Sequence, residues 1–311
     1  MRGLLALLFA LLLSACSAGS APRDAEVVIP AGSSLTAAAD ILETAGGIES
    51  ASSFLTYAKL SGGDEPIKPG TYRIEKGTSG EAVLRMLQDG KTVQHYVTVP
   101  EGLPSIMVWD RLMANDDLTG KIPVPAEGSI LPETYAYQKG ETRAAVVARM
   151  QEAMDKAWAD LWPKRNARAF PKDRNEAITL ASIIEKETPV ADELTTVSAV
   201  YTNRLELGMM LQADPTIIYP ITKGKALGRR IRKSEIADVN DYNTYAMAGL
   251  PKGPIANPSR AAIAAALNPN DSKALYFVAD GKGGHIFAGT LAEHNANVKK
   301  WYAIRRARGE M

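Results

Sequence analysis

The sequence predicts an α+β protein in which a small module of short strands and helices precedes a larger, mixed α/β domain. Residues 27–99 alternate short extended runs with short amphipathic segments, which is typical of a small α+β module. A long helical pattern follows over Thr142 to Trp162, and two extended runs joined by a glycine-rich turn stand near the C-terminus. Because 46% of the 311 residues are hydrophobic, the chain can form two or three domain cores.

The charges of the chain are nearly balanced. It has 36 Lys and Arg against 35 Asp and Glu, which gives a formal net charge of +1 at pH 7. No bulk polyanion is indicated as a partner, and we expect no binding of nucleic acid. Five basic residues near the C-terminus lie on a predicted helix and are more typical of a solvated face: Lys299, Lys300, Arg305, Arg306 and Arg308.

The N-terminus has the pattern of an exported protein. Arg2 precedes an apolar run from Leu4 to Leu13, which is short for a membrane-spanning helix. The next residues, Ser-Ala-Cys, end at Cys16 and resemble the lipobox at which bacterial lipoproteins are lipidated and cleaved. We therefore predict a lipoprotein signal peptide over 1–16, lipidation of Cys16 and a polar tether over 17–26. A plain signal peptide or an uncleaved anchor is the alternative, and Cys16 is the single cysteine, so no disulfide is expected.

Residues 27–100 are predicted to form the first folded module. The pattern is extended over 27–30 and 67–74, and helical over 35–42, 54–60 and 82–87. Thr78 and Glu81 have the spacing of a capping box before the last of these helices. The arrangement is similar to LysM modules, which bind glycans. A purely structural spacer is the alternative.

Residues 101–170 are predicted to connect this module to a C-terminal domain. A helix is expected from Ser105 to Met113, a rigid turn at 131–135 leads into a short strand, and the long helix follows. Within 171–311, helices are expected over 175–188, 197–207 and 259–267. The Asp214-Pro-Thr turn is expected to take the chain out of helix, and strands over 275–279 and 285–287 form the hairpin. Thr290 and Glu293 are predicted to cap a final helix.

The helix over 175–188 ends in two carboxylates that point in different directions. At about 100° per residue, Glu187 falls inside the broad apolar face of this helix, whereas Glu185 lies near the margin of that face and Lys186 points away. The apolar face is formed by Ala177, Leu180, Ile183 and Ile184.

A carboxyl group on an apolar face is partly desolvated, which raises its pKa towards neutral pH and lets it donate a proton. Glu187 is therefore the candidate general acid. The alternative is an acidic helix end, with Glu185 and Glu187 solvated or paired to Lys186 and nearby arginines.

Other kinds of site are poorly supported. His95, His285 and His294 are far apart in the sequence and no cysteine joins them, so no metal site is expected. The sequence has no Gly-x-Ser-x-Gly elbow and no phosphate-binding loop, and we expect no cofactor.

An exported chain with a desolvated helix-end Glu and polar groups on rigid loops suits cleavage of a glycosidic bond. Hydrolases of the usual kind need two carboxylates at a set separation, which Glu185 and Glu187 do not supply because they face apart. A lytic transglycosylase needs one Glu: it protonates the leaving oxygen, and then takes the proton of the muramyl O6 hydroxyl that attacks within the sugar.

Several motifs occur in the order found in the endolytic murein transglycosylase family, also called MltG or YceG-like, which this sequence resembles from about Pro132 to Val298. They are Leu180-Ala-Ser-Ile-Ile-Glu-Lys-Glu-Thr188, Asn203-Arg-Leu205, Leu211-Gln-Ala-Asp-Pro-Thr216, Tyr242-Asn-Thr-Tyr245, Gly249-Leu-Pro251, Gly253-Pro-Ile255, Tyr276-Phe-Val-Ala-Asp-Gly281, Gly284-His285 and His294-Asn295. The resemblance implies a LysM-like subdomain before a catalytic domain of lytic transglycosylase type, here 171–311. It also implies cleavage within nascent peptidoglycan strands that leaves 1,6-anhydroMurNAc ends.

The resemblance places the catalytic acid at Glu187 and leaves Glu185 as the alternative acid. Six further residues are implied to line the saccharide cleft, although the same motifs could equally hold loops in shape: Gln212, Asp214, Thr216, Tyr242, Asn243 and Tyr245. Expected partners are peptidoglycan strands, the membrane through Cys16 or an N-terminal anchor, and peptidoglycan synthases.

The N-terminus departs from the family, whose members usually begin with a transmembrane helix at the inner membrane. The lipobox, followed by Ser17 rather than aspartate, is compatible with the outer membrane as well. Two other functions stay open: a peptidoglycan-binding lipoprotein without activity, and a hydrolytic muramidase.

Overall fold

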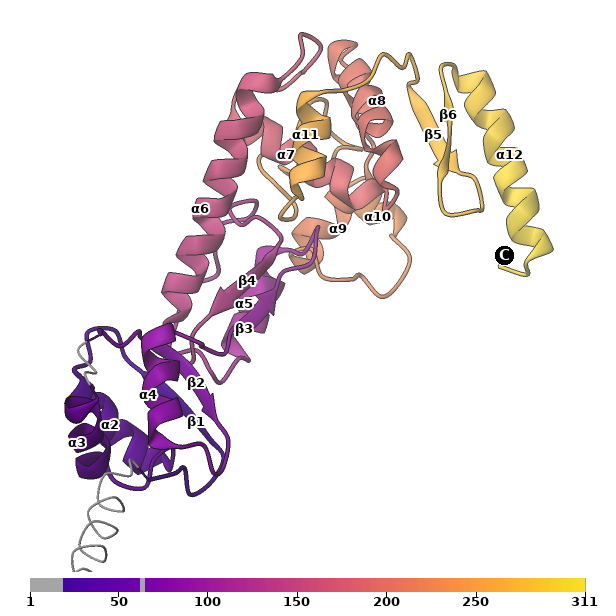
Figure 1. Cartoon of the computed structure of the whole chain (residues 1–311). Coiled ribbons are helices and arrows are strands. Elements are labelled where there is room, and N and C mark those ends of the chain that lie inside the picture. The colour runs from indigo at the N-terminus through magenta and orange to yellow at the C-terminus, as the bar shows by residue number, and fades with distance from the viewer. Residues whose placement is uncertain (1–18, 62–64, 311) are drawn as a thin grey trace, which may run out of the picture. The chain divides into compact units, whose positions relative to one another are not determined.

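The computed structural model describes residues 19–61 and 65–310, which divide into two units (Figure 1). The first unit contains residues up to Tyr96 together with 117–119 and 136–141, and the second contains the rest. Cys16 and the predicted signal peptide lie outside the described residues. No helix within the described part of the chain is long and apolar enough to cross a membrane. The predicted domain boundaries at residues 100 and 170 stay a prediction.

The first unit is a small α+β module, as predicted. Its elements are β1 (Ala25–Ile29), α2 (Leu35–Ala45), α3 (Ala51–Leu60), β2 (Gly70–Ile74) and α4 (Gly80–Asp89). Strands β1 and β2 pair antiparallel, with Val27 opposite Tyr72, and α2 contacts both β1 and α3. Val27, Phe54 and Tyr72 belong to the buried core of this unit. Its relation to LysM modules stays a prediction.

The predicted capping box before α4 is wrong by one residue. Ser79, not Thr78, is the N-cap, and its hydroxyl accepts a hydrogen bond from Ala82 N at 3.3 Å. Thr78 instead donates its hydroxyl to the carbonyl of Glu75 at 2.7 Å. Two adjacent hydroxyl residues can each serve as a cap, and sequence spacing alone selected the wrong one.

The second unit is mainly helical. Its elements are α5 (Ser105–Met113), α6 (Arg143–Leu161), α7 (Arg174–Glu187), α8 (Leu194–Glu206), α9 (Asp214–Thr222), α10 (Lys233–Ile236), α11 (Arg260–Leu267), β5 (Tyr276–Ala279), β6 (His285–Ala288) and α12 (Leu291–Ala307). Strands β5 and β6 pair antiparallel, with Phe277 opposite Phe287, as the predicted hairpin requires. Strands β3 (His95–Thr98) and β4 (Thr134–Tyr137) also pair, and the division between the units falls within both.

The expectation that Asp214-Pro-Thr ends the helical path is wrong, because these residues begin α9. Pro215 stands in the first turn, where its missing N–H has no intrahelical partner to lose and its fixed φ suits the helix. The predicted cap of the final helix is confirmed, because Thr290 with Glu293 forms the capping box of α12. Thr142, predicted as the first residue of the long helix, is the N-cap of α6.

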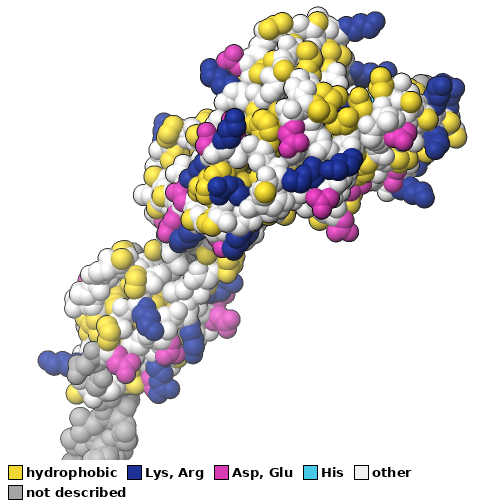
Figure 2. Space-filling view, turned by 90° about the horizontal axis from the view of Figure 1, so that it is seen from above, with side chains coloured by type: hydrophobic (Ala, Val, Ile, Leu, Met, Phe, Trp, Pro, Cys, Tyr) yellow, Lys and Arg dark blue, Asp and Glu magenta, His cyan; other side chains and the backbone are white. Residues whose placement is uncertain are grey.

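Helix α7 lies at the centre of the second unit. It packs against α8, α9 and α11, and all eight residues from Ala177 to Ile184 are buried. The predicted single apolar face is therefore too narrow: a helix enclosed by neighbours is buried on all sides. Figure 2 shows basic and acidic side chains interspersed over one face of the molecule, as the balanced charge leads us to expect.

Candidate active site

Helix α7 ends where the local sequence requires it to end. Thr188 precedes Pro189 and has extended backbone angles, φ −136° and ψ 132°, because a residue before proline is disfavoured in helix. Glu187 is thus the last residue of the helix. A helix that ends inside the unit leaves its final side chain facing the space between the surrounding elements.

The chain just after Glu187 is held by the β5–β6 hairpin. The Thr188 hydroxyl donates to the Glu193 carboxylate at 2.8 Å, and this carboxylate also accepts the His285 backbone N–H at 2.7 Å and contacts His285 Nδ1 at 2.7 Å. A Cβ at Gly284 would lie 2.6 Å from Glu193 Oε1, so a larger residue there would displace the Glu193 carboxylate. These contacts fix the end of α7 from outside the helix.

Glu185 and Glu187 have different surroundings, as their helical spacing predicted. Glu185 Oε2 accepts a hydrogen bond from Ser259 N at 2.9 Å, at the N-terminus of α11, where a carboxylate is favoured. Lys186 Nζ reaches the carbonyl of Gly102 at 3.3 Å. Glu185 is therefore engaged in holding α11, and it does not line the cleft into which Glu187 faces.

Glu187 lies in a cleft of about 300 Å³. The residues that line this cleft come from α7, α8, α9, β5, α12 and two loops: Glu187, Tyr201, Arg204, Leu211, Gln212, Asp214, Tyr245, Phe277 and His294. We call it the Glu187 cleft.

The environment of Glu187 favours its protonated form. Burial, reinforced by the charge of Asp214, raises the pKa of Glu187 to about 7, while the Tyr201 hydroxyl and the Arg204 charge act in the opposite direction. One carboxyl oxygen, Oε1, is fully buried and has no hydrogen-bond partner among the described residues. A carboxyl group in this state can give up a proton near neutral pH and take one back.

A strained residue and a pair of hydroxyls shape one wall of the cleft. Gln212 has φ 52°, in the left-handed region that non-glycine residues rarely adopt. Its backbone N–H bonds the Thr244 carbonyl at 3.0 Å, and the hydroxyls of Thr216 and Thr244 lie 2.9 Å apart. The Asp-Pro-Thr and Asn-Thr-Tyr motifs are thus joined to each other through buried groups.

Six residues were predicted to line a saccharide cleft, and the structure places three of them in the Glu187 cleft. Gln212, Asp214 and Tyr245 line the Glu187 cleft, and the Tyr245 hydroxyl donates to Asp214 Oδ1 at 2.7 Å. Thr216 and Tyr242 do not line it. Thr216 is fully buried in the hydroxyl pair, and the ring of Tyr242 packs against Tyr219 at 4.9 Å between centroids.

Asn243 is also absent from the cleft. Its side-chain amide donates to the carbonyls of Glu235, Ile236 and Asp238, and its Oδ1 accepts from Tyr245 N at 3.0 Å. It is fully buried. Its contacts therefore hold the loop that presents Tyr245, which was the alternative role for these motifs.

Four polar or aromatic residues of the cleft were not predicted as site residues: Tyr201, Arg204, Phe277 and His294. Arg204 is 8% exposed and donates to the carbonyls of Leu275, Met210 and Leu211 at 2.6 to 3.1 Å, which fixes β5 and the loop before Gln212. Tyr201 and Arg204 are one helical turn apart on α8 and so share a side of that helix, but this spacing alone does not indicate a site. The Arg204 and His294 positions also stand in the motifs that carry the family resemblance.

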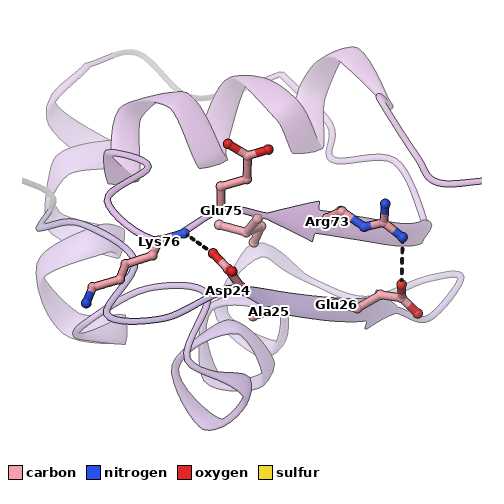
Figure 3. Close-up of a pocket in the computed structure, with 7 residues that line it drawn as sticks. Asp24, Ala25, Glu26, Arg73, Glu75 and Lys76 are labelled. Carbon is pink, nitrogen blue, oxygen red and sulfur yellow. Dashed lines mark hydrogen bonds and ion pairs between the residues drawn. The ribbon is translucent and has the colours of Figure 1, made fainter.

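A second, larger hollow of about 570 Å³ lies in the first unit, along β1 and β2 (Figure 3). Three of its charged side chains are engaged: Asp24 Oδ1 accepts from Lys76 N at 2.7 Å, and Arg73 lies 3.5 Å from Glu26. No buried polar atom without a partner lines it. In the described residues no group of His, Cys, Asp and Glu side chains could hold a metal ion.

Comparison with known proteins places the chain in a family. The model of the YceG-like family matches residues 27–300. An endolytic murein transglycosylase of Bacillus subtilis (strain 168) is 28% identical over 309 residues, covering 89% of this chain and 84% of the relative. One of Streptococcus pneumoniae serotype 2 is 28% identical, covering 88% of this chain and 57% of the relative, so the chain spans little more than half of that protein. The crystal structure of a yceG-like protein from Listeria monocytogenes superposes with a TM-score of 0.57 at 28% identity, covering 88% of this chain and 98% of that one.

Proposed function

Since the chain belongs to the YceG-like family, we propose that it is a peptidoglycan lytic transglycosylase with Glu187 as its catalytic residue. The observation that carries the proposal is the buried carboxyl group of Glu187, whose pKa is raised to about 7, in a cleft lined by polar and aromatic side chains. The relatives named endolytic murein transglycosylases support the same activity.

In the proposed reaction Glu187 acts first as an acid and then as a base. The protonated carboxyl group donates its proton to the oxygen of the MurNAc-GlcNAc β-1,4 bond, and the bond to C1 of MurNAc breaks. The O6 hydroxyl of the same MurNAc attacks C1, and the carboxylate takes the O6 proton. The products are a 1,6-anhydroMurNAc end and a free GlcNAc hydroxyl, and no water is consumed. A pKa near neutrality suits both proton transfers.

A hydrolytic muramidase is the second candidate, because the cleft contains another carboxylate. The charge of Asp214 acts on Glu187, and a hydrolase requires such a second carboxyl group as nucleophile or base. The Tyr245 hydroxyl already occupies one oxygen of Asp214. Hydrolysis leaves a reducing MurNAc end, and transglycosylation leaves an anhydro end, so the products distinguish the two reactions.

The remaining parts of the proposal concern place and partners. Lipidation of Cys16 would tether the enzyme to a membrane of the cell envelope, the first unit would bind glycan as LysM modules do, and cleavage within nascent strands beside peptidoglycan synthases would help to terminate their elongation. The predicted lipobox and the α+β order of the first unit support these proposals. A scaffold lipoprotein without activity is the alternative.

The test is digestion of purified, uncrosslinked peptidoglycan by the chain from Ser17 onward, with product identification by mass. We expect anhydro ends from internal bonds, and a rate about 10² to 10⁴ times lower for Glu187→Gln. Glu185→Gln is the matched control: its amide oxygen can still accept from Ser259 N, and we expect its rate to stay near that of the parent. Reducing ends that disappear in Asp214→Asn would establish the muramidase instead, and a folded parent that releases nothing would leave the scaffold.

A further inference from the structure

His294 lies on the wall of the Glu187 cleft and belongs to the second turn of α12. Its ring stacks on the ring of Tyr276 in β5, with 5.2 Å between the centroids and an angle of 25° between the planes. The guanidinium of Arg204 lies 5.1 Å from the same tyrosine ring. The aromatic contact with Tyr276 therefore fixes the orientation of the imidazole ring.

The two ring nitrogens of His294 differ in exposure. Nδ1 is fully buried and has no hydrogen-bond partner among the described residues. Nε2 is not among the buried polar atoms that lack a partner, and no residue in the described ranges bonds it, so Nε2 keeps exposed surface. Of the two polar atoms of this half-buried ring, Nε2 is thus the accessible one, and the ring lines the Glu187 cleft.

The protonation state of the ring follows from this difference. Burial, with the charge of Arg204, lowers the pKa of His294, so the imidazole is neutral at neutral pH and carries a single N–H. A buried N–H without an acceptor is rarer in proteins than a buried acceptor without a donor. The hydrogen is therefore assigned to Nε2, where it faces the cleft as a donor.

Two other donor residues of the cleft are engaged within the protein. Arg204 directs Nε and Nη1 to backbone carbonyls, and the Tyr245 hydroxyl donates to Asp214. Glu187 Oε1, like His294 Nδ1, has no partner among the described residues. The cleft thus holds a proton donor at Glu187 and a fixed N–H donor at His294 that the protein itself leaves unsatisfied.

We propose that His294 is a substrate-binding residue that donates its Nε2–H to an acceptor oxygen of the glycan, a hydroxyl or an acetamido oxygen, in the Glu187 cleft. The proposal rests on the proposed function and names a further residue of the same site. His294 does not exchange protons with the substrate in this role. It orients the sugar against Glu187 through one hydrogen bond.

The experiment measures glycan binding by calorimetry in the Glu187→Gln background, where no bond is cleaved. The probe is a soluble, uncrosslinked oligomer of alternating GlcNAc and MurNAc. Two further substitutions separate the hydrogen bond from the stacking. His294→Gln keeps an N–H at the reach of Nε2 and loses the ring, whereas His294→Phe keeps a ring to stack on Tyr276 and loses the donor.

We expect His294→Phe to bind the oligomer about 3 to 10 times more weakly than the parent, the effect of one hydrogen bond, and His294→Gln to bind nearly as tightly as the parent. Should the phenylalanine variant fail to fold, His294→Asn replaces it, because its shorter amide reaches only as far as Nδ1; the same weakening is expected. Equal binding by the phenylalanine variant, or weaker binding by the glutamine variant than by the phenylalanine variant, overturns the proposal in favour of a structural stacking role.

The proposed function can fail separately from this inference. If the Glu187→Gln protein binds the oligomer with the expected dependence on residue 294, but the parent produces no anhydro ends, then His294 binds glycan and the transglycosylase function is wrong. If the Glu187→Gln protein binds no oligomer at all, the His294 proposal is overturned, and the transglycosylase function is still decided by whether the parent produces anhydro ends.

Discussion

Two of the hollows in the described part of the chain, the one along β1 and β2 and the Glu187 cleft, contain similar residues in different environments. The first is the larger, at about 570 Å³ against about 300 Å³. Both contain aspartate, glutamate and arginine. Along β1 and β2 these groups form ion pairs and backbone hydrogen bonds at the surface, and Arg73 keeps 66% of its side chain exposed (Figure 3). In the Glu187 cleft Arg204 is 8% exposed and Glu187 has a buried oxygen without a partner.

The desolvation of the charged groups in a hollow, rather than the volume of the hollow, therefore determines how strongly these groups interact. Charged groups that water reaches keep their ordinary chemistry, and their mutual attraction is weakened by solvent. Groups removed from water interact strongly with the charges around them, and their proton affinity shifts to a range that a reaction can use. Three substitutions in the Glu187 cleft test this contrast. Each is compared with the same substitution of a residue of the same type in the hollow along β1 and β2.

The largest effect on stability is expected from Arg204→Met. This change removes the donor to three backbone carbonyls, one in a buried contact and two in partly buried contacts, which we expect to lower the free energy of unfolding by about 3 kcal/mol. Arg73→Met in the other hollow removes one solvated ion pair and is expected to change little. Urea denaturation measures both. Similar losses in the two variants would mean that burial does not distinguish the two hollows.

The next effect concerns the cost of ionising Glu187 inside the fold. Its folded pKa is about 7, raised from 4.5, so between these pH values the folded protein holds a proton that the unfolded chain has lost. Stability contributed by this group is therefore fully present below pH 4.5 and is lost as pH rises to about 7. At about 1.4 kcal/mol per pH unit, the loss is about 3 kcal/mol.

Glu187→Gln lacks this titration and should gain stability relative to the parent as pH rises. We expect the difference in unfolding free energy between variant and parent to increase by about 3 kcal/mol from pH 4.5 to pH 8. Other titrating groups are common to both proteins and cancel in the difference. Glu26→Gln, in the hollow along β1 and β2, serves as the control. A difference for Glu187→Gln that stays constant with pH would contradict the desolvated state of the carboxyl group.

Sequence patterns predicted most of the local structure of this chain. Helix α5 runs from Ser105 to Met113 as predicted, Thr290 with Glu293 caps α12, and the β5–β6 hairpin forms. These features depend on residues within one or two turns of each other. The error at Pro215 arose because proline suits both a turn and the first turn of a helix, and the local sequence does not decide between them.

The candidate site was predictable only in part, for a physical reason. The helical period separated Glu187 from Glu185, and the structure gives the two carboxylates the different surroundings that this separation requires. The helical period of α7 could not predict Tyr201, Phe277 or His294, because these residues reach the cleft from other elements: α8, β5 and α12. Nor could it separate Asp214 and Tyr245, which line the cleft, from Asn243, whose hydrogen bonds hold the loop.

The smallest effect, a shift in the pH dependence of the cleavage rate, is expected from Asp214→Asn. The negative charge of Asp214 contributes to the raised pKa of Glu187, so its removal lowers that pKa. In the proposed mechanism cleavage needs protonated Glu187, so the rate should fall off at lower pH than in the parent, with a rate at pH 8 that is about 3 to 10 times lower. Asparagine keeps an oxygen that can accept from Tyr245.

The readout is the position of the alkaline limb in a rate profile from pH 5 to 9, because loss of a cleft residue also lowers the height of the profile. Asp24→Asn, at the corresponding carboxylate of the solvated hollow, should leave the limb in place. A limb that does not move in Asp214→Asn would show that the charge of Asp214 is screened from Glu187, and the two hollows would then differ less in their electrostatics than their burial indicates.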